Sequence, residues 1–289
     1  MSAPAPQTVG LVPHPDRPIA HELAVRSAKS LAARGVSVRV PREEAEAAGL
    51  ADLACDPADF ITDLDVAISL GGDGTMLRTV DMAYEAGVAV LGVNVGQMGY
   101  LADVEPSELD AGLERLVAGD YAVVERMVLE VRVESEGPAQ GRWWALNEAV
   151  IEKSRTGRMA RLAVAINGTP FTTYAADGVI VATPTGSTAY NFSARGPIVS
   201  PRHRCILLTP VSPHMLFDRS LVLGPEEDLR FDVEDGHAVM LTIDGRMLGD
   251  LDGGDAVACT SGRRPARIVT FKERDFHQIL KAKFGLADR

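Results

Sequence analysis

The chain has 289 residues, which is enough for two domains of ordinary size, and 46% of them are hydrophobic while only 5% are aromatic. Lys and Arg number 29 against 40 Asp and Glu, and the net charge of -11 argues against nonspecific binding to nucleic acids or anionic membranes. These values favour a globular α/β or α+β protein that acts on small molecules.

Signals for secretion, membrane insertion or disulfide formation are lacking in this sequence. Residues 1–10 show no basic region followed by an apolar core, and no apolar run reaches the roughly 18 residues of a membrane span. Cys55, Cys205 and Cys259 are scattered without CxxC spacing, which predicts neither a disulfide framework nor a zinc site. We therefore expect free thiols and a cytoplasmic protein.

The first part of the chain alternates between strand patterns and helix patterns. Such alternation implies right-handed crossovers in an open parallel sheet. The segment 66–70 is rich in branched apolar residues and predicts a strand buried on both faces. Strands are expected over 8–12, 36–40, 66–70 and 88–93, and helices over 17–34, 43–48, 75–85 and 106–118.

Two glycine-rich segments follow consecutive predicted strands. The first is GGDGT at 71–75, and the second is NVGQMGYL at 94–101. Parallel strands end at the same edge of a sheet, and ligands of such sheets bind outside that edge. Both loops are therefore expected to face one ligand.

From about Tyr121 the pattern changes to alternation of apolar and polar residues, which is typical of half-exposed antiparallel strands. Turn signals such as Asn167-Gly168 recur, and no long helical period interrupts them. We predict an α/β domain with an open parallel sheet over 1–122 and a mostly antiparallel β domain over 123–268. Residues 269–289 regain a helical pattern and are expected to pack back on the first domain.

Three glycines surround one acid in the first loop. Without side chains, Gly71, Gly72 and Gly74 allow a ligand to approach the backbone closely. The N–H groups of a helix that begins near Thr75 could then bind an anion such as a phosphate. A tight turn in which Asp73 caps the helix is the alternative.

A second dense segment lies in the predicted β domain. Residues 177–193, DGVIVATPTGSTAYNFS, run from an apolar strand through a Thr/Pro/Gly/Ser turn into a short helix. Hydroxyl and N–H groups at a helix start suit a polar ligand that carries phosphate. A helix capped by Ser or Thr, without any ligand, explains the same residues.

Taken together, these motifs resemble the bacterial NAD kinase family. The resemblance covers nearly the whole chain after the first sixty or so residues. GGDGT alone is shared with diacylglycerol-type lipid kinases, whereas the TPTGSTAY segment combined with Asn-Glu is specific. The matching segments are GGDGT at 71–75, Asn94-x-Gly96-x-x-Gly99-x-Leu101, Asn147-Glu148, residues 177–190 with Ser193 and Gly196-Pro197-Ile198, PVSPH at 210–214, and Ile243-Asp244-Gly245.

The resemblance implies transfer of a phosphoryl group from ATP, or in some members inorganic polyphosphate, to the 2′-hydroxyl of the adenosine ribose of NAD. Asp73 would be the general base, and Gly71, Gly72, Gly74 and Thr75 would bind the donor phosphates. Mg²⁺ or another divalent metal would be held mainly by those phosphates, so no metal ligands are predicted in the chain.

The same resemblance implies a set of NAD-binding residues. Asn147 and Glu148 would bind the substrate, with Glu148 accepting hydrogen bonds from ribose hydroxyls. Arg78 could neutralise phosphate charge, or it could be an ordinary surface arginine. Arg246 stands where many members carry Gln or His, and Ala175-Ala176 replace a basic residue of several members, which leaves the choice between NAD and NADH open. The other members of the set are Asp73, Gly74, Arg158, Asp177, Thr188, Ala189, Tyr190, Asn191, Phe192 and Ser193.

Other functions remain open at this point. A diacylglycerol-type lipid kinase would need a membrane-facing entrance, which the acidic charge disfavours. A dinucleotide sensor would bind NAD or NADP without needing Asp73. No complete GxGxxG opens a helix and no GxxxxGK[ST] occurs, which disfavours a Rossmann dehydrogenase and a P-loop kinase. The expected partners are NAD and ATP or polyphosphate, without nucleic acid or membrane, in a homodimer or homotetramer.

Overall fold

The computed structural model describes residues 4–96, 99–154, 158–272 and 275–286. The chain divides into two compact units. The first unit comprises Met1–Glu125 with Ala266–Arg289, and the second comprises Arg126–Pro265. The boundaries predicted from the sequence fell at 122 and 268, so the second of them lies inside a strand of the first unit, Ala266–Thr270.

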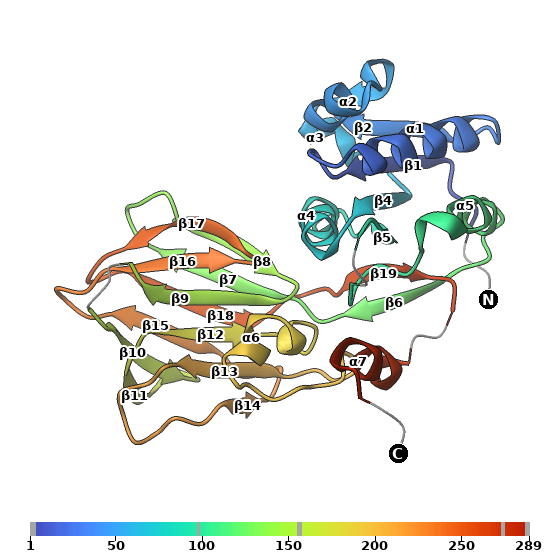
Figure 1. Ribbon diagram of the computed structural model, residues 1–289. Helices are drawn as coiled ribbons and strands as arrows, with labels where there is room; N and C mark the ends of the chain where they lie inside the picture. Colours follow the sequence, from blue (N-terminus) through green and yellow to red (C-terminus); the bar gives the residue numbers. More distant parts are fainter. Residues whose placement is uncertain (1–3, 97–98, 155–157, 273–274, 287–289) are drawn as a thin grey trace. The chain divides into compact units, whose positions relative to one another are not determined.

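The first unit is built on a seven-stranded sheet (Figure 1) with the strand order β3-β2-β1-β4-β5-β19-β6. The pairs β1 with β2, β1 with β4, β2 with β3, β4 with β5, and β5 with β19 are all parallel. Its strands are β1 (Thr8–Pro13), β2 (Ser37–Pro41), β3 (Ala54–Cys55), β4 (Val66–Gly71), β5 (Ala89–Asn94), β6 (Ala122–Arg126) and β19 (Ala266–Thr270).

Helices α1 and α4 show why the helical periods of the sequence were informative. Pro18 opens α1, where its missing N–H costs nothing, and Leu23 and Leu31 are buried on one side of the helix. In α4, Met76 and Val80 are buried in the same way. The helices of this unit are α1 (Pro18–Ala32), α2 (Arg42–Ala48), α3 (Pro57–Phe60), α4 (Asp73–Tyr84), α5 (Leu109–Val117) and α7 (Phe276–Phe284), with 3₁₀ turns at Ala51–Leu53 and Pro106–Glu108.

The second unit consists of two six-stranded sheets whose neighbouring strands are antiparallel. The strand orders are β11-β10-β15-β18-β7-β8 and β14-β13-β12-β9-β16-β17 (Figure 1). The strands are β7 (Leu129–Glu134), β8 (Gly141–Ala145), β9 (Glu148–Lys153), β10 (Ala160–Ile166), β11 (Thr169–Ala176), β12 (Gly178–Ala182), β13 (Ile206–Val211), β14 (Leu221–Leu223), β15 (Leu229–Val233), β16 (Val239–Ile243), β17 (Arg246–Leu251) and β18 (Ala256–Ser261).

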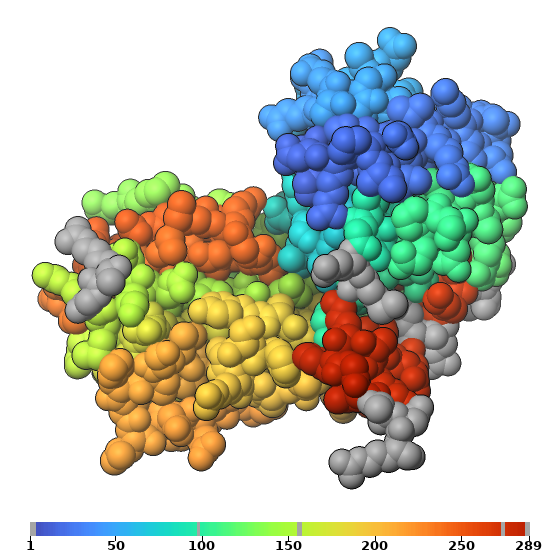
Figure 2. Space-filling view, in the orientation of Figure 1, coloured from blue at the N-terminus to red at the C-terminus, as the bar shows by residue number. Residues whose placement is uncertain are grey.

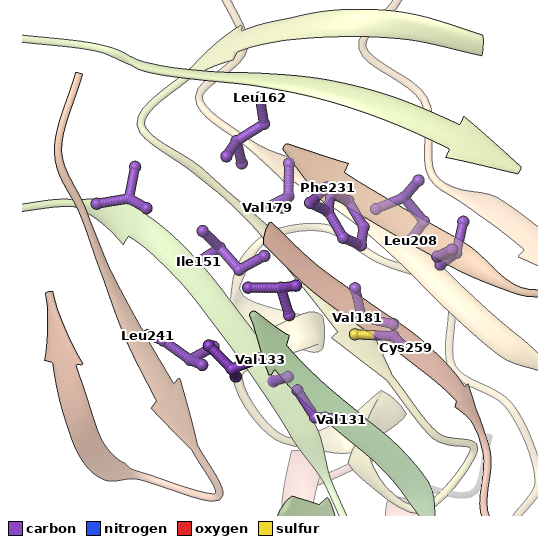
Figure 3. Packing of buried hydrophobic residues seen from close by; sticks show 14 of the residues in the cluster. Val131, Val133, Ile151, Leu162, Val179, Val181, Leu208, Phe231, Leu241 and Cys259 are labelled. Carbon is purple, nitrogen blue, oxygen red and sulfur yellow. The ribbon is translucent and has the colours of Figure 1, made fainter. Parts of the chain in front are cut away.

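One hydrophobic cluster joins the inner faces of these two sheets (Figure 3). Val131 and Phe231 come from one sheet, and Ile151 and Val181 come from the other. All four are fully buried, so their packing holds the two layers face to face. This packed core fixes the ends of β9, β12 and β16, and therefore also fixes where the loops that adjoin these strands begin.

The predicted fold class is confirmed, with an α/β domain on a mostly parallel sheet and an antiparallel β domain. Helix α7 groups with the first unit, as the helical pattern at the end of the chain suggested. In the described part of the chain, no helix has both the length and the apolar character needed to cross a membrane.

Candidate active site

The turn between β4 and α4 is short, because Gly71 ends the strand and Asp73 begins the helix. Gly71 lacks a side chain for a structural reason, since an added Cβ would lie 2.2 Å from Thr75 Oγ1. Around a Cβ added at Gly72 or Gly74, by contrast, the described residues beyond the immediate chain neighbours leave open space. Two such glycines at a helix start leave backbone N–H groups accessible to an anionic ligand.

The Asp73 carboxylate accepts two hydrogen bonds from the second glycine-rich segment. The backbone nitrogen of Tyr100 lies 3.0 Å from Oδ2, and that of Leu101 lies 3.2 Å from Oδ1. The two loops therefore meet at the carboxyl edge of the sheet, as their positions after β4 and β5 indicated. Gln97 and Met98, which belong to the second motif, lie outside the described residues.

Two arginines of the first unit make contacts that the sequence did not indicate. Arg78 in α4 forms an ion pair with Glu44 of α2, whose side chain is only 2% exposed, so its charge is used within the fold. Arg17, just before α1, donates to the carbonyl of Val95, and a Cβ at Gly96 would lie 2.7 Å from its Nη1. Sequence reasoning missed Arg17, although its position after β1 places it at the same sheet edge.

In the second unit, Asp244 organises the loop that carries the Asn-Glu pair. Its carboxylate accepts hydrogen bonds from the backbone nitrogens of Leu146, Asn147 and Glu148, at 2.7, 2.9 and 3.0 Å. Asp244 adopts a φ of 47°, which is uncommon for a residue with a side chain, in the turn from β16 to β17. The sequence motif included Asp244 but gave no indication of this function.

Replacing Asp244 by Ala is expected to lower the free energy of unfolding by about 3 kcal/mol, because three backbone donors lose a charged acceptor. Urea denaturation followed by circular dichroism measures this change. Asp244→Asn is the matched control, since Asn tolerates positive φ and keeps one acceptor oxygen, and it should lose clearly less. Equal stability of Asp244→Ala and the wild type would contradict this interpretation.

Glu148 begins β9 and is the most strongly perturbed acid of the site. Its side chain is 7% exposed, and burial, followed by the negative charge of Asp244, raises the pKa of Glu148 to about 8. The backbone N–H of Tyr190 donates to this carboxyl group, while Oε2 has no partner among the described residues. A buried acceptor without a partner is costly for the free protein and is suited to a ligand hydroxyl.

The turn after β12 packs directly on the Asn-Glu loop. The backbone nitrogen of Thr183 donates to the carbonyl of Asn147 at 2.9 Å, and a Cβ at Gly186 would lie 2.1 Å from that carbonyl oxygen. A 3₁₀ turn, Gly186–Thr188, and then Ala189 lead into α6 (Tyr190–Ser193). The TPTGSTAY segment and the Asn-Glu pair, 35 or more residues apart in sequence, thus form one structural group.

The residues of α6 divide into a buried and an exposed set. Asn191 is fully buried, accepts from the Thr209 hydroxyl at 2.7 Å and donates to the carbonyl of Pro197, so its side chain is used inside the fold. Tyr190 and Phe192 are 38% and 37% exposed, and Ser193 is exposed as well. The segment is visible as part of the yellow surface in Figure 2.

Asp177, which precedes β12, forms an ion pair with Lys153 at the end of β9. Ala176, and not a basic residue, stands directly before Asp177. The positive charge beside Asp177 comes instead from Lys153 of the neighbouring strand. Burial raises the pKa of Tyr190, and the charges of Glu152 and Asp177 add to this effect. Glu148 and Asp177 mark opposite ends of the β9–β12 pair, roughly 17 Å of strand apart.

Arg246 and Arg158, two residues predicted to bind NAD, make other contacts in the structure. Arg246 opens β17 with its guanidinium 5.1 Å from the centre of the Trp143 ring. Arg158 is exposed and donates to the carbonyl of Gly236 before β16, whereas Asp244 follows β16. The five residues of that strand separate the two ends by roughly 17 Å, so Arg158 is not brought together with Asn147 and Glu148.

Comparison with known proteins gives matches over both units. The model of the ATP-NAD kinase N-terminal domain matches residues 9–121, and that of the ATP-NAD kinase C-terminal domain matches residues 146–271. An NAD kinase of Heliobacterium modesticaldum is 41% identical over 281 residues, covering 96% of this chain and 98% of that protein. An NAD kinase of Moorella thermoacetica is 38% identical over 278 residues, covering 96% and 89%.

Solved structures agree with these matches. A yeast NADH kinase complexed with NADH superposes with a TM-score of 0.90 at 26% identity, covering 100% of this chain and 89% of that one. An Archaeoglobus fulgidus NAD kinase in complex with ATP has the same fold, with a TM-score of 0.70, 24% identity and 96% of both chains covered. From the two domain matches and the full-length relatives, we conclude that the chain belongs to the NAD kinase family.

Proposed function

We propose that the protein is an NAD kinase that transfers a phosphoryl group from ATP or polyphosphate to the 2′-hydroxyl of the adenosine ribose of NAD. The full-length relatives named NAD kinase support this activity. The observation that carries it in the structure is the Asp73 carboxylate, which lies at the start of α4 beside two glycines with open space around them. A carboxylate next to accessible helix N–H groups suits a reaction that moves a proton and binds phosphates.

In this reaction the ribose oxygen forms a new bond to the terminal phosphorus, and the bond from that phosphorus to the bridging oxygen of the donor breaks. With ATP the leaving group is ADP, which keeps the electron pair of the broken bond. Asp73 accepts the hydroxyl proton as the new bond forms, because a carboxylate is too weak a base to remove it beforehand. Most of the rate enhancement would come from positioning and charge stabilisation.

The second unit would bind the dinucleotide along β9 and β12. Glu148 offers a buried oxygen that has no partner among the described residues, which suits a ribose hydroxyl, and Asn147 is fixed beside it. Tyr190 presents a partly exposed ring that suits stacking on a base. Glu148 and Asp177 lie roughly 17 Å of strand apart, so different parts of one bound dinucleotide would contact the two acids.

A divalent cation such as Mg²⁺ would reach the site bound to the donor phosphates. Among the residues that the structure describes, no group of three or more His, Cys, Asp or Glu side chains could hold a metal ion. We expect the cation to be coordinated mainly by phosphate oxygens and water, as Mg²⁺ often is in kinases. When bound, the cation would neutralise phosphate charge.

Substitution of Gly72 or Gly74 by Ala is expected to leave the fold intact and to raise the KM for ATP about tenfold or more. A Cβ at either position meets no described atom outside the adjacent residues, so only the bound donor would be displaced. Gly74→Ala should even raise the free energy of unfolding by about 0.5–1 kcal/mol, because Ala is the better helix former. Unchanged KM values for the donor in both variants would argue against phosphate binding at this loop.

We further propose that the protein is a cytoplasmic homodimer or homotetramer. Phe171, Leu216 and Val222 of the second unit are exposed apolar side chains of the kind that subunit contacts cover. Light scattering coupled to gel filtration measures the mass of the assembly. A monomer at micromolar concentration would contradict this proposal.

The activity itself is tested by incubating the purified protein with NAD, Mg²⁺ and either ATP or polyphosphate. The expected product is NADP, detected with an NADP-specific dehydrogenase and assigned to the 2′ position by ³¹P NMR. Binding of NAD without turnover would identify a dinucleotide sensor instead. Phosphorylation of diacylglycerol in place of NAD would identify a lipid kinase.

A further inference from the structure

The segment Gly99–Leu101 holds both oxygens of the Asp73 carboxylate. Tyr100 donates its N–H to Oδ2, and Leu101 donates its N–H to Oδ1. We propose that this segment is a positioning element that fixes the orientation of Asp73 for proton transfer, an inference that rests on the role of Asp73 proposed above. The segment acts through backbone donors, so its Tyr and Leu side chains are not required for this contact.

Gly99 is the point at which the contact is tightest. A Cβ added there would lie 2.2 Å from Asp73 Oδ1 and 3.0 Å from Cγ, closer than real Cβ contacts allow. Gly99 is buried, and the approach of the carboxylate leaves no room for a side chain there.

The donors are held in place by the chain that follows them. Ala102 packs on Gly92 of β5 so closely that a Cβ at Gly92 would lie 2.8 Å from the Ala102 Cα atom. The backbone nitrogens of Asp103 and Val104 both donate to the carbonyl of Gly92, at 3.0 and 3.1 Å. Asp103 Oδ2 in turn accepts from Thr270 Oγ1 in β19 at 3.0 Å. Strands of the central sheet thus fix the position from which Tyr100 and Leu101 donate.

This arrangement leaves the carboxylate able to act. Each carboxylate oxygen has two lone pairs, and the segment occupies one of them on each oxygen of Asp73. The remaining lone pairs are free to accept a hydroxyl proton, in directions that the two N–H groups determine. A base that is already oriented loses less freedom when the reaction begins.

The test compares the wild type with Gly99→Ala, Asp73→Asn and the double variant. In Gly99→Ala the new methyl group displaces the carboxylate, so kcat should fall about 100-fold while KM for NAD changes little. The double variant should be no slower than Asp73→Asn alone, because Gly99 acts through Asp73. Gly112→Ala is the matched control: it is a buried glycine of α5 whose added Cβ would have 3.4 Å to its nearest neighbour.

Amide hydrogen exchange at Tyr100 and Leu101 tests the contact without reference to activity. Both amides should exchange slowly in the wild type and faster in Gly99→Ala, and at least one of them should exchange faster in Asp73→Asn, which keeps a single acceptor oxygen. Wild-type kcat in Gly99→Ala, or an equal loss with and without the Asp73 carboxylate, overturns the proposal. Unchanged exchange in Asp73→Asn overturns it too, whereas absence of NADP formation by the wild type would overturn the proposed function separately.

Discussion

Replacing Asp73 by Asn is expected to reduce kcat by roughly 10²–10⁴-fold while NAD binding is largely kept. Asn has the same shape and retains one oxygen that can accept from Tyr100 or Leu101, so the local structure is disturbed little. Its amide cannot take up the proton of a ribose hydroxyl. The loss therefore falls on the chemical step rather than on substrate binding.

Turnover is measured as NADP formation, and NAD affinity is measured by calorimetry on the same preparations. Asp65→Asn provides the control, because Asp65 also accepts two backbone hydrogen bonds, from Gln7 and Thr8, at 2.7 and 2.9 Å. Asp65 lies directly before β4, whereas Asp73 follows that strand. The turnover of Asp65→Asn should therefore fall far less than that of Asp73→Asn. Retained turnover in Asp73→Asn would refute the assignment of this residue as the base.

The loop that carries Asp73 could be predicted because its signals are local. An apolar run of branched residues predicts a buried strand, and glycines directly after it predict a tight turn into a helix. The structure has β4 end at Gly71 and α4 begin at Asp73, within two residues of the expected helix start. Local composition and spacing determine these elements, so one sequence suffices to find them.

Contacts between distant parts of the chain could not be predicted in this way. Asp244 accepts hydrogen bonds from the Asn-Glu loop, which lies 96 or more residues away in the sequence. No periodic pattern in the sequence indicates which carboxylate binds this loop. The ion pair of Arg78 with Glu44 could not be predicted either, because the two residues belong to different helices. Strand β19 joins the first sheet after the whole β domain has intervened, so a change of pattern along the chain could not locate it.

Binding of NAD is expected to release a proton near pH 7 through Glu148. Burial raises the pKa of this group to about 8, so the free protein holds it mostly protonated at neutral pH. Ribose hydroxyls that donate to the carboxyl group favour its ionised form and lower its pKa in the complex. Calorimetry in two buffers of different ionisation enthalpy measures the protons released.

Glu148→Gln should abolish this proton release and weaken NAD binding about 10- to 100-fold, since a charged acceptor is replaced by a neutral one. Glu152→Gln, on the same strand but partly exposed, is the control and should leave the proton release in place. Equal proton release in the wild type and Glu148→Gln would show that another group titrates.

The raised pKa of Glu148 also predicts how the free energy of unfolding changes with pH. The folded-state pKa of about 8 lies above the unfolded value near about 4.3, so folding favours the protonated acid. This contribution is fully present below about pH 4 and is lost as the pH rises through 8, because the buried carboxylate must then ionise. Relative to Glu148→Gln, the wild type should therefore lose free energy of unfolding between about pH 5 and 9, on the order of a few kcal/mol. Urea titrations of both proteins across that range measure the difference, and parallel pH profiles would mean that Glu148 is not protonated in the folded protein.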